Sequence, residues 1–208
     1  MMPAPRAAGF STLELLIGLA ILGILIAVGL PSMNNWLMSA KVSGAAEFYS
    51  EGFKLARSQA VMHNAASRIT LDDNAVSGQM DWQVDICFPT ATVPCNATSG
   101  NWSTPATPAA NDPEGSAGFK SVLRSADSLP STKVMAETLS PPGATDIYFT
   151  SVGWVDTGFS PRLAQIQLAP AAGNAGAFPT VAVAVTLAGA AAKCSPTAPA
   201  HDSRACPP

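Results

Sequence analysis

The hydrophobic and polar positions divide the chain into two unequal parts. From Leu15 to Ala40 no residue carries a charge, and the segment from Leu15 to Leu30 is apolar on every side. A helix needs about 20 residues to cross the hydrocarbon core of a bilayer. The pattern therefore predicts a helix that is inserted in a membrane or buried among other proteins.

Beyond Pro31 the helical pattern continues but becomes one-sided. Apolar residues recur at steps of three and four over residues 45–60, and the charged side chains mostly occupy the other positions. This spacing predicts an amphipathic half-helix that packs on a globular head. The pattern weakens at His63 and Asn64, where we expect the helix to end. His63 is accordingly interpreted as a helix-end residue and not as a ligand or base.

Short segments with strand character follow the helix. One long helix followed by several short strands predicts an α+β fold in which the helix packs on a head of antiparallel β-sheet. The expected strands are 67–71, 81–88, 119–124, 133–139, 146–150, 163–168 and 180–187.

The second of these strands has two distinct faces. Trp82, Val84, Ile86 and Phe88 alternate with Asp81, Gln83, Asp85 and Cys87. Such alternation is typical of a half-buried strand. We therefore expect Cys87 on the open face, where it is accessible to Cys95 across a short loop.

Two segments have the composition of irregular structure. Residues 89–118 are rich in Pro, Thr, Ala, Asn and Gly, which predicts a long surface loop. The Pro-rich tail 194–208 is expected to be loose unless a disulfide closes it.

The four cysteines are Cys87, Cys95, Cys194 and Cys206. None belongs to a C-x-x-C pair, and the chain has only two histidines, so we expect no metal site. An even number of cysteines favours disulfides in an oxidising compartment. Three connectivities are possible, and the spacing favours Cys87–Cys95 and Cys194–Cys206.

Composition and motifs also bear on enzyme and DNA-binding functions. The formal net charge is −3, which provides no general attraction for nucleic acid or anionic lipid. His201, Asp202 and Ser203 are the residue types of a catalytic triad, but side chains adjacent in sequence rarely converge. The chain has no phosphate-binding loop. We therefore expect no catalytic residues, no cofactor and no enzyme activity, and we regard DNA as an unlikely partner.

The N-terminal apolar segment has three possible interpretations. A cleaved secretory signal would have a shorter apolar stretch and a small-residue cleavage site after it, and neither is present. An ordinary signal anchor explains the length but not Glu14, because a carboxylate at the bilayer centre costs about 2.5–3.5 kcal/mol. A carboxylate in this position needs a partner, and the third interpretation provides one.

The stretch Gly9-Phe10-Ser11-Thr12-Leu13-Glu14-Leu15-Leu16 resembles the class III signal of type IV prepilins. The resemblance implies that prepilin peptidase cuts between Gly9 and Phe10 and that the new terminus is N-methylated. Counting from Phe10, Glu14 is fifth and Pro31 twenty-second, both positions that the family uses in assembly. It also implies that Glu14 pairs with the Phe10 amine of a neighbouring subunit. The alternative is a protonated glutamate near the lipid headgroups.

The resemblance also implies an organisation and a location. Residues 1–9 would be the cleaved leader, 10–31 the transmembrane and assembly half of the helix, and 32–65 the amphipathic half. Residues 66–193 would form the head, and 194–208 the tail. The chain would span the inner membrane once with its head in the periplasm, and then join a pilus or pseudopilus at the cell surface with other pilins or pseudopilins.

The head is similar to one subfamily. The similarity is carried by residues 55–60, 68–71, the strand around Trp82, residues 149–153 and the Val-rich strand near the C-terminus. These look like the FimT/FimU/GspH minor pilins and pseudopilins. The resemblance implies a FimT/FimU-like minor pilin that initiates or caps a pilus. The alternatives are a GspH-type pseudopilin of a type II secretion system and a DNA-binding minor pilin for transformation.

Of these three functions, DNA binding for transformation is the least favoured. Relatives that bind DNA carry a basic Gly-Arg-x-Arg element near the C-terminus. The corresponding residues here, 189–194, contain one lysine and no arginine.

Overall fold

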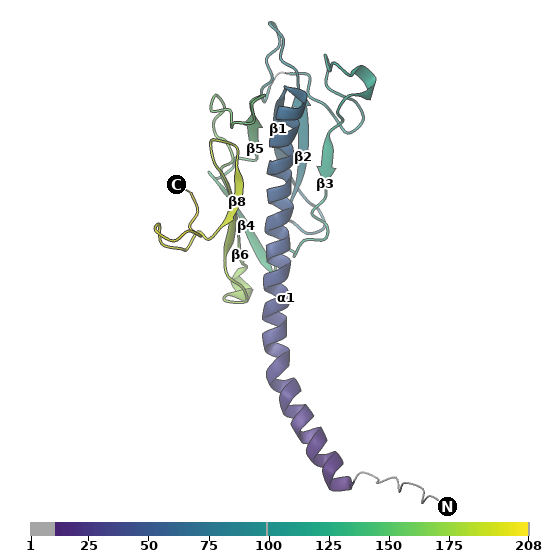
Figure 1. Ribbon diagram of the computed structural model, residues 1–208, viewed down its shortest axis with the longest axis vertical. Coiled ribbons are helices and arrows are strands. Elements are labelled where there is room, and N and C mark those ends of the chain that lie inside the picture. The colour runs from purple at the N-terminus through teal and green to yellow at the C-terminus, as the bar shows by residue number, and fades with distance from the viewer. Residues whose placement is uncertain (1–10, 99, 208) are drawn as a thin grey trace, which may run out of the picture.

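The fold consists of one long helix and a β-rich head that packs along part of it (Figure 1). The computed structural model describes residues 11–98 and 100–207, without the side chains of residues 28–32. Helix α1 spans Thr12–His63, and its N-terminal part extends well beyond the head. The fold is therefore α+β, as the sequence predicted.

Both ends of α1 have recognisable caps. Ser11 is the N-cap, and a capping box links its side chain and backbone to Glu14. At the other end Asn64 adopts the left-handed conformation, with φ of 48°, and its N–H donates to the carbonyl groups of Ala60 and Val61. Asparagine tolerates this conformation better than most residues. The helix thus ends at His63, where its apolar periodicity weakens.

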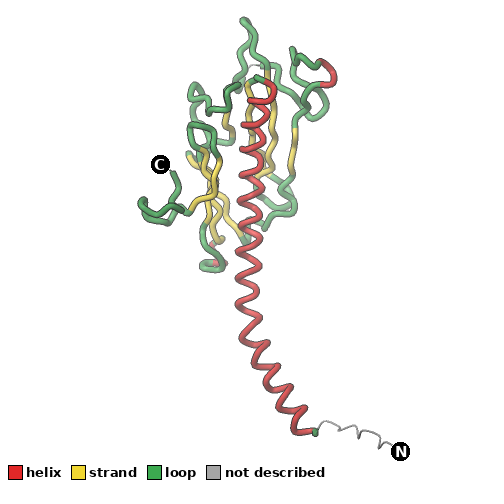
Figure 2. The backbone as a smooth tube through the Cα atoms, in the orientation of Figure 1, coloured by secondary structure: helices red, strands yellow, loops and turns green. Residues whose placement is uncertain are grey.

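The head contains two four-stranded antiparallel sheets, shown as strands in Figure 2. The first has the order β3-β2-β1-β5 and the second the order β4-β6-β7-β8. Helix α1 contacts strands of both sheets. The strands of the first sheet are β1 (Ala66–Asp73), β2 (Met80–Cys87), β3 (Val122–Arg124) and β5 (Asp146–Phe149). Those of the second are β4 (Met135–Ser140), β6 (Gln165–Pro170), β7 (Val181–Val185) and β8 (Ala191–Cys194). Two short 3-10 helices, η1 (Gly115–Ala117) and η2 (Ala172–Asn174), lie in the connections.

The core lies between the C-terminal half of α1 and the two sheets. Tyr49 and Phe53 on α1 are fully buried, as is Trp82 on β2, whose indole N–H donates to the carbonyl oxygen of Phe48 at 2.9 Å. The second sheet contributes apolar side chains such as Ile166 and Leu168. The one-sided pattern of residues 45–60 corresponds to this interface.

The burial of the second face of β2 corrects the sequence prediction. Cys87 and Asp85 are buried, although we expected this face to be open. Arg68 binds the Asp85 carboxylate at 2.8 Å. The long loop after β2 is held at the edge of the strand, where the Ser103 N–H donates to the Ile86 carbonyl and the Ile86 N–H donates to the Ser103 hydroxyl. Trp102 from the same loop stacks on the Arg68 guanidinium, 4.4 Å from ring centroid to Cζ. The loop is therefore anchored to the sheet.

Strand β8 forms one edge of the second sheet, and the tail follows it. The sequence did not predict β8, which pairs with β7 through Ala191–Cys194. The tail folds back so that Cys206 packs against Ala182 and Ala184. The small residues Ala182 and Ala184 of β7 are therefore covered by the tail.

Candidate functional site

Of the residues predicted for processing and assembly, Glu14 and Pro31 lie in α1. Gly9 and Phe10 are outside the described residues. Glu14 is exposed in the first turn of the helix, where its Oε2 accepts from the Ser11 N–H at 3.2 Å. The Glu14 N–H in turn donates to the Ser11 hydroxyl at 3.2 Å. In the isolated chain the carboxylate therefore caps its own helix.

The surface around Glu14 is apolar and exposed on all sides. Leu15, Gly18, Leu19 and Leu22 form a shallow groove with Glu14. An added Cβ at Gly18 would meet no heavy atom within 4 Å. The other large apolar side chains of this part, all about half exposed or more, are Leu13, Leu16, Ile17, Ile21, Ile24, Leu25 and Ile26. A single carboxylate thus stands in a surface that water solvates poorly.

Pro31 lies within α1, which continues through it without a break. A proline inside a helix removes one backbone hydrogen bond and favours bending. Figure 1 shows that the N-terminal part of α1 curves away from the axis of the part that packs on the head.

Within residues 11–98 and 100–207, no helix is both long enough and apolar enough to cross a membrane.

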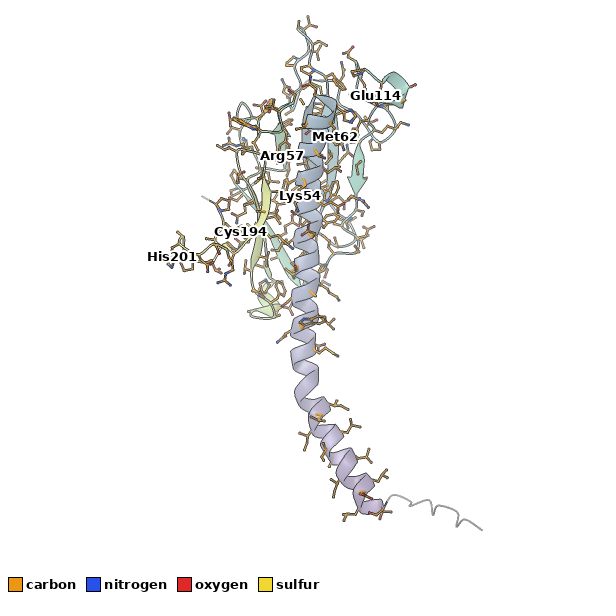
Figure 3. All side chains as sticks on the ribbon, in the orientation of Figure 1. Lys54, Arg57, Met62, Glu114, Cys194 and His201 are labelled. Atoms are coloured by element: carbon orange, nitrogen blue, oxygen red, sulfur yellow. A yellow bond between two sulfur atoms is a disulfide. The ribbon has the colours of Figure 1, made fainter. Side chains whose placement is uncertain are left out.

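Both expected disulfides are present. Cys87 bonds to Cys95 with a Cα–Cα distance of 6.0 Å, and Cys194 bonds to Cys206 with a Cα–Cα distance of 4.8 Å. The first anchors the start of the long loop, and the second holds the tail against β8. Figure 3 shows Cys194 at the sheet and His201 farther out along the tail. Among the described residues, no group of three His, Cys, Asp or Glu side chains could hold a metal ion.

The triad-like residues of the tail are engaged differently. The Asp202 carboxylate binds the Arg204 guanidinium through contacts of 2.7 and 3.1 Å, which lowers the pKa of Asp202 to about 2. His201 and Ser203 are exposed. The residues that sequence reasoning considered as a triad therefore form a solvated turn held by an ion pair.

A second exposed apolar surface lies at the end of α1. Val61 and Met62 on the helix are exposed, as are Val152, Trp154 and Leu187 in neighbouring turns. The turn at Gly153 reaches α1, because its carbonyl oxygen accepts from the Arg57 Nε at 3.1 Å. The turn of Leu187 joins it, since the Val155 N–H donates to the Leu187 carbonyl at 3.0 Å. Figure 3 labels Lys54, Arg57 and Met62 along this part of the helix.

Sequence reasoning missed a partly buried polar cluster around Glu137. Glu137 on β4 accepts from the Tyr49 hydroxyl at 2.8 Å and from the Met80 N–H at 3.3 Å. A signal for it exists, because Met135, Glu137 and Leu139 alternate on one face of a strand. An acidic residue between two apolar ones on that face indicates a buried carboxyl group.

Comparison with protein families identifies the class of this chain. A family model described as Type II transport protein GspH matches residues 45–189. This match covers more than half of the chain. The chain belongs to the GspH family. Comparisons with curated proteins and with solved structures gave no match.

Membership of the GspH family agrees with the arrangement described above. The family consists of pilin-like structural components, and the head on the C-terminal half of α1 is the part that matches. The matched residues begin at Ala45, so the segment around Glu14 lies outside the match and is interpreted from its own residues.

Proposed function

We propose that this GspH family member is a FimT/FimU-like minor type IV pilin. It is cut by prepilin peptidase between Gly9 and Phe10, N-methylated at Phe10, and incorporated into a pilus, where it initiates or caps assembly. The observation that carries this proposal is the contrast along α1. A folded head covers its C-terminal half, whereas the N-terminal half exposes apolar side chains around one carboxylate, Glu14.

The proposal divides the chain into functional segments. Residues 1–9 are the leader, 10–31 insert in the inner membrane and later in the filament core, and 32–65 support the head. Residues 66–193 form the head on the periplasmic side, and 194–208 form the tail. The exposed apolar side chains of α1 favour this division, because their burial by lipid or by other pilins removes them from water.

Glu14 has a defined role in the proposal. In the filament the amine of Phe10 from a neighbouring subunit binds the Glu14 carboxylate and fixes the axial register. The pairing compensates a charge that would be costly to leave unpaired in an apolar core.

The experiment compares three variants of the full chain in cells. Gly9→Val should remain uncleaved in the inner membrane, and Glu14→Gln should be cleaved but absent from sheared filaments. Glu51→Gln, an exposed glutamate on the head half of the same helix, is the matched control and should be cleaved and incorporated. Normal incorporation of both Gly9→Val and Glu14→Gln would contradict the proposal.

The main alternative is a GspH-type pseudopilin of a type II secretion system. The name of the matching family favours it. The disulfides that anchor the loop and the tail fit either function, because the periplasm and the cell surface are both oxidising. Deleting the gene distinguishes the two. Loss of surface pili with normal protein secretion supports the minor pilin, and the reverse supports the pseudopilin.

A further inference from the structure

Glu137 lies where the two sheets of the head meet α1. Glu137 belongs to β4, one of the two edge strands of the second sheet. Its carboxylate contacts the hydroxyl of Tyr49 on α1 at 2.8 Å and the N–H of Met80 on β2 of the first sheet at 3.3 Å. One side chain of the second sheet therefore binds both α1 and a strand of the first sheet.

The hydrogen atoms available at this junction favour a neutral carboxyl group. Tyr49 Oη lies 2.8 Å from Glu137 Oε2 and 3.1 Å from the carbonyl oxygen of Met80, and it accepts from the Met80 N–H at 3.2 Å. If Glu137 is ionised, the single hydroxyl hydrogen of Tyr49 must serve two acceptors. If Glu137 is protonated, its O–H donates to Tyr49, and Tyr49 donates to Met80, so that both contacts contain a hydrogen.

The surroundings of Glu137 also disfavour its charge. Its Oε1 is buried and has no hydrogen-bond partner among the described residues. None of the ion pairs formed by the described lysines, arginines and histidines includes it. The titratable groups that face the cluster are Tyr49 from α1, Asp73 from β1 and Asp81 from β2, none of which is a cation. Burial raises the pKa of Glu137 to about 7, and Asp73 adds to the increase, whereas the hydrogen bonds from Tyr49 and Met80 oppose it.

We propose that Glu137 makes the junction of the two sheets a pH-sensitive joint. The protonated side chain holds β4 against α1 and β2, and loss of the proton leaves a buried carboxylate without a cation and loosens this contact. The joint is independent of how the N-terminus is processed. It makes the head of the subunit more rigid in acidic medium than in alkaline medium.

The direction of the effect follows from proton linkage. The closed joint binds the proton more tightly than an open joint, whose carboxyl group titrates near its ordinary 4.5. The closed state is therefore most favoured below pH 4.5 and loses its advantage as the pH rises to about 7. Over this interval the opening equilibrium should rise about tenfold per pH unit, and above it the equilibrium should stay constant.

Amide hydrogen exchange of the full chain in detergent micelles tests the joint. The reporter is the Met80 N–H, which donates to Tyr49 and Glu137. The control is the Ile86 N–H, which lies on the same strand and donates to the Ser103 hydroxyl. After correction for the intrinsic rate, Met80 protection should fall about 40-fold between pH 5 and pH 7, while Ile86 protection stays constant.

Two variants complete the test. Glu137→Gln keeps a donor for Tyr49 but has no ionisable proton, so its Met80 protection should not change with pH. Glu114→Gln removes an exposed glutamate far along the chain and should behave like the wild type. Constant Met80 protection in the wild type, or the same fall in Glu137→Gln, would overturn the proposal.

A second measurement does not depend on the folding of a variant. The infrared band of a protonated carboxyl group is followed in the wild-type chain as the pH is raised. A band that persists above pH 6 and disappears near pH 7 supports the joint. Loss of every such band by pH 5.5 would show that Glu137 is ionised in the closed head, and the proposal would fail.

Discussion

The two halves of α1 share one continuous backbone but have opposite surroundings. In the C-terminal half, Tyr49 and Phe53 are fully buried against both sheets. In the N-terminal half, Leu16 is 63% exposed, and the apolar side chains around it are similarly bare. The sequence difference is one of arrangement, since apolar residues occupy one face in the first case and every face in the second.

This contrast separates two kinds of stabilisation. The C-terminal half contributes its apolar surface to the core of its own head, so its substitutions should affect folding. Within the described residues, no other part of the chain covers the N-terminal half. Its substitutions should instead affect association with lipid or with other subunits.

The largest expected difference is between Phe53→Ala and Leu16→Ala. Phe53→Ala should lower the free energy of unfolding of the head by about 3–5 kcal/mol, because it leaves a cavity between α1 and the sheets. Leu16→Ala should leave it within about 0.5 kcal/mol of the wild type. Urea unfolding in detergent, followed by tryptophan fluorescence, measures both. Equal effects of the two substitutions would remove the distinction between the halves.

The fold of the head should also depend on its own disulfides. Replacing both Cys194 and Cys206 by serine should lower the free energy of unfolding by about 2–3 kcal/mol, because the unfolded chain regains the entropy of the open loop. The same urea titration measures the change, and the wild type under reducing conditions should shift in the same direction. An unchanged midpoint would mean that the tail does not contribute to the fold.

Gly52 and Gly18, one in each half of α1, allow a comparison with a smaller expected effect on stability. A Cβ at Gly52 would lie 2.7 Å from Ile69 Cδ1 and 3.0 Å from the Trp82 ring, whereas Gly18 has open space. Overpacking costs about 1–3 kcal/mol, and the better helix propensity of alanine returns about 1 kcal/mol. Gly52→Ala should therefore lower the free energy of unfolding by about 1 kcal/mol, while Gly18→Ala should not lower it. Stabilisation by Gly52→Ala would show that the helix packs less closely on β1 and β2 than described.

The smallest expected effect concerns DNA. The chain has a net charge of −3, and residues 189–194 contain no arginine, so phosphate contacts should be few. The full chain in micelles should not retard double-stranded DNA at micromolar protein and physiological salt. Salt-sensitive binding under these conditions would favour the transformation function over the pilus role.

Periodicity was sufficient to predict most of the fold. The end of α1 at His63 and the strands around Ile69 and Val84 follow from local patterns, because apolar spacing and turn residues are properties of short segments. Strand β8 was missed because Ala191–Cys194 is short and lacks branched or aromatic residues. Its pairing depends on β7, which is a partner that local propensity does not describe.

Burial produced by distant segments was the part that the sequence did not reveal. The face expected to be open at Cys87 and Asp85 is buried. Arg68 binds Asp85, and Trp102 from the long loop stacks on Arg68, so no short window contains both the strand and its partners. Glu137 differs, because its position between Met135 and Leu139 indicated a buried carboxyl group that the sequence interpretation did not use. Glu14 could be interpreted from the sequence because the residues around it resemble the class III signal of type IV prepilins.

The central claim is that the N-terminal half of α1 becomes an assembly element after processing at Gly9. Intact-mass analysis of the chain from sheared surface filaments tests this claim most directly. The account predicts a chain that begins at Phe10, carries one N-methyl group and contains two disulfides. A chain in the filament fraction that begins at Met1, or at any residue beyond Glu14, would contradict it.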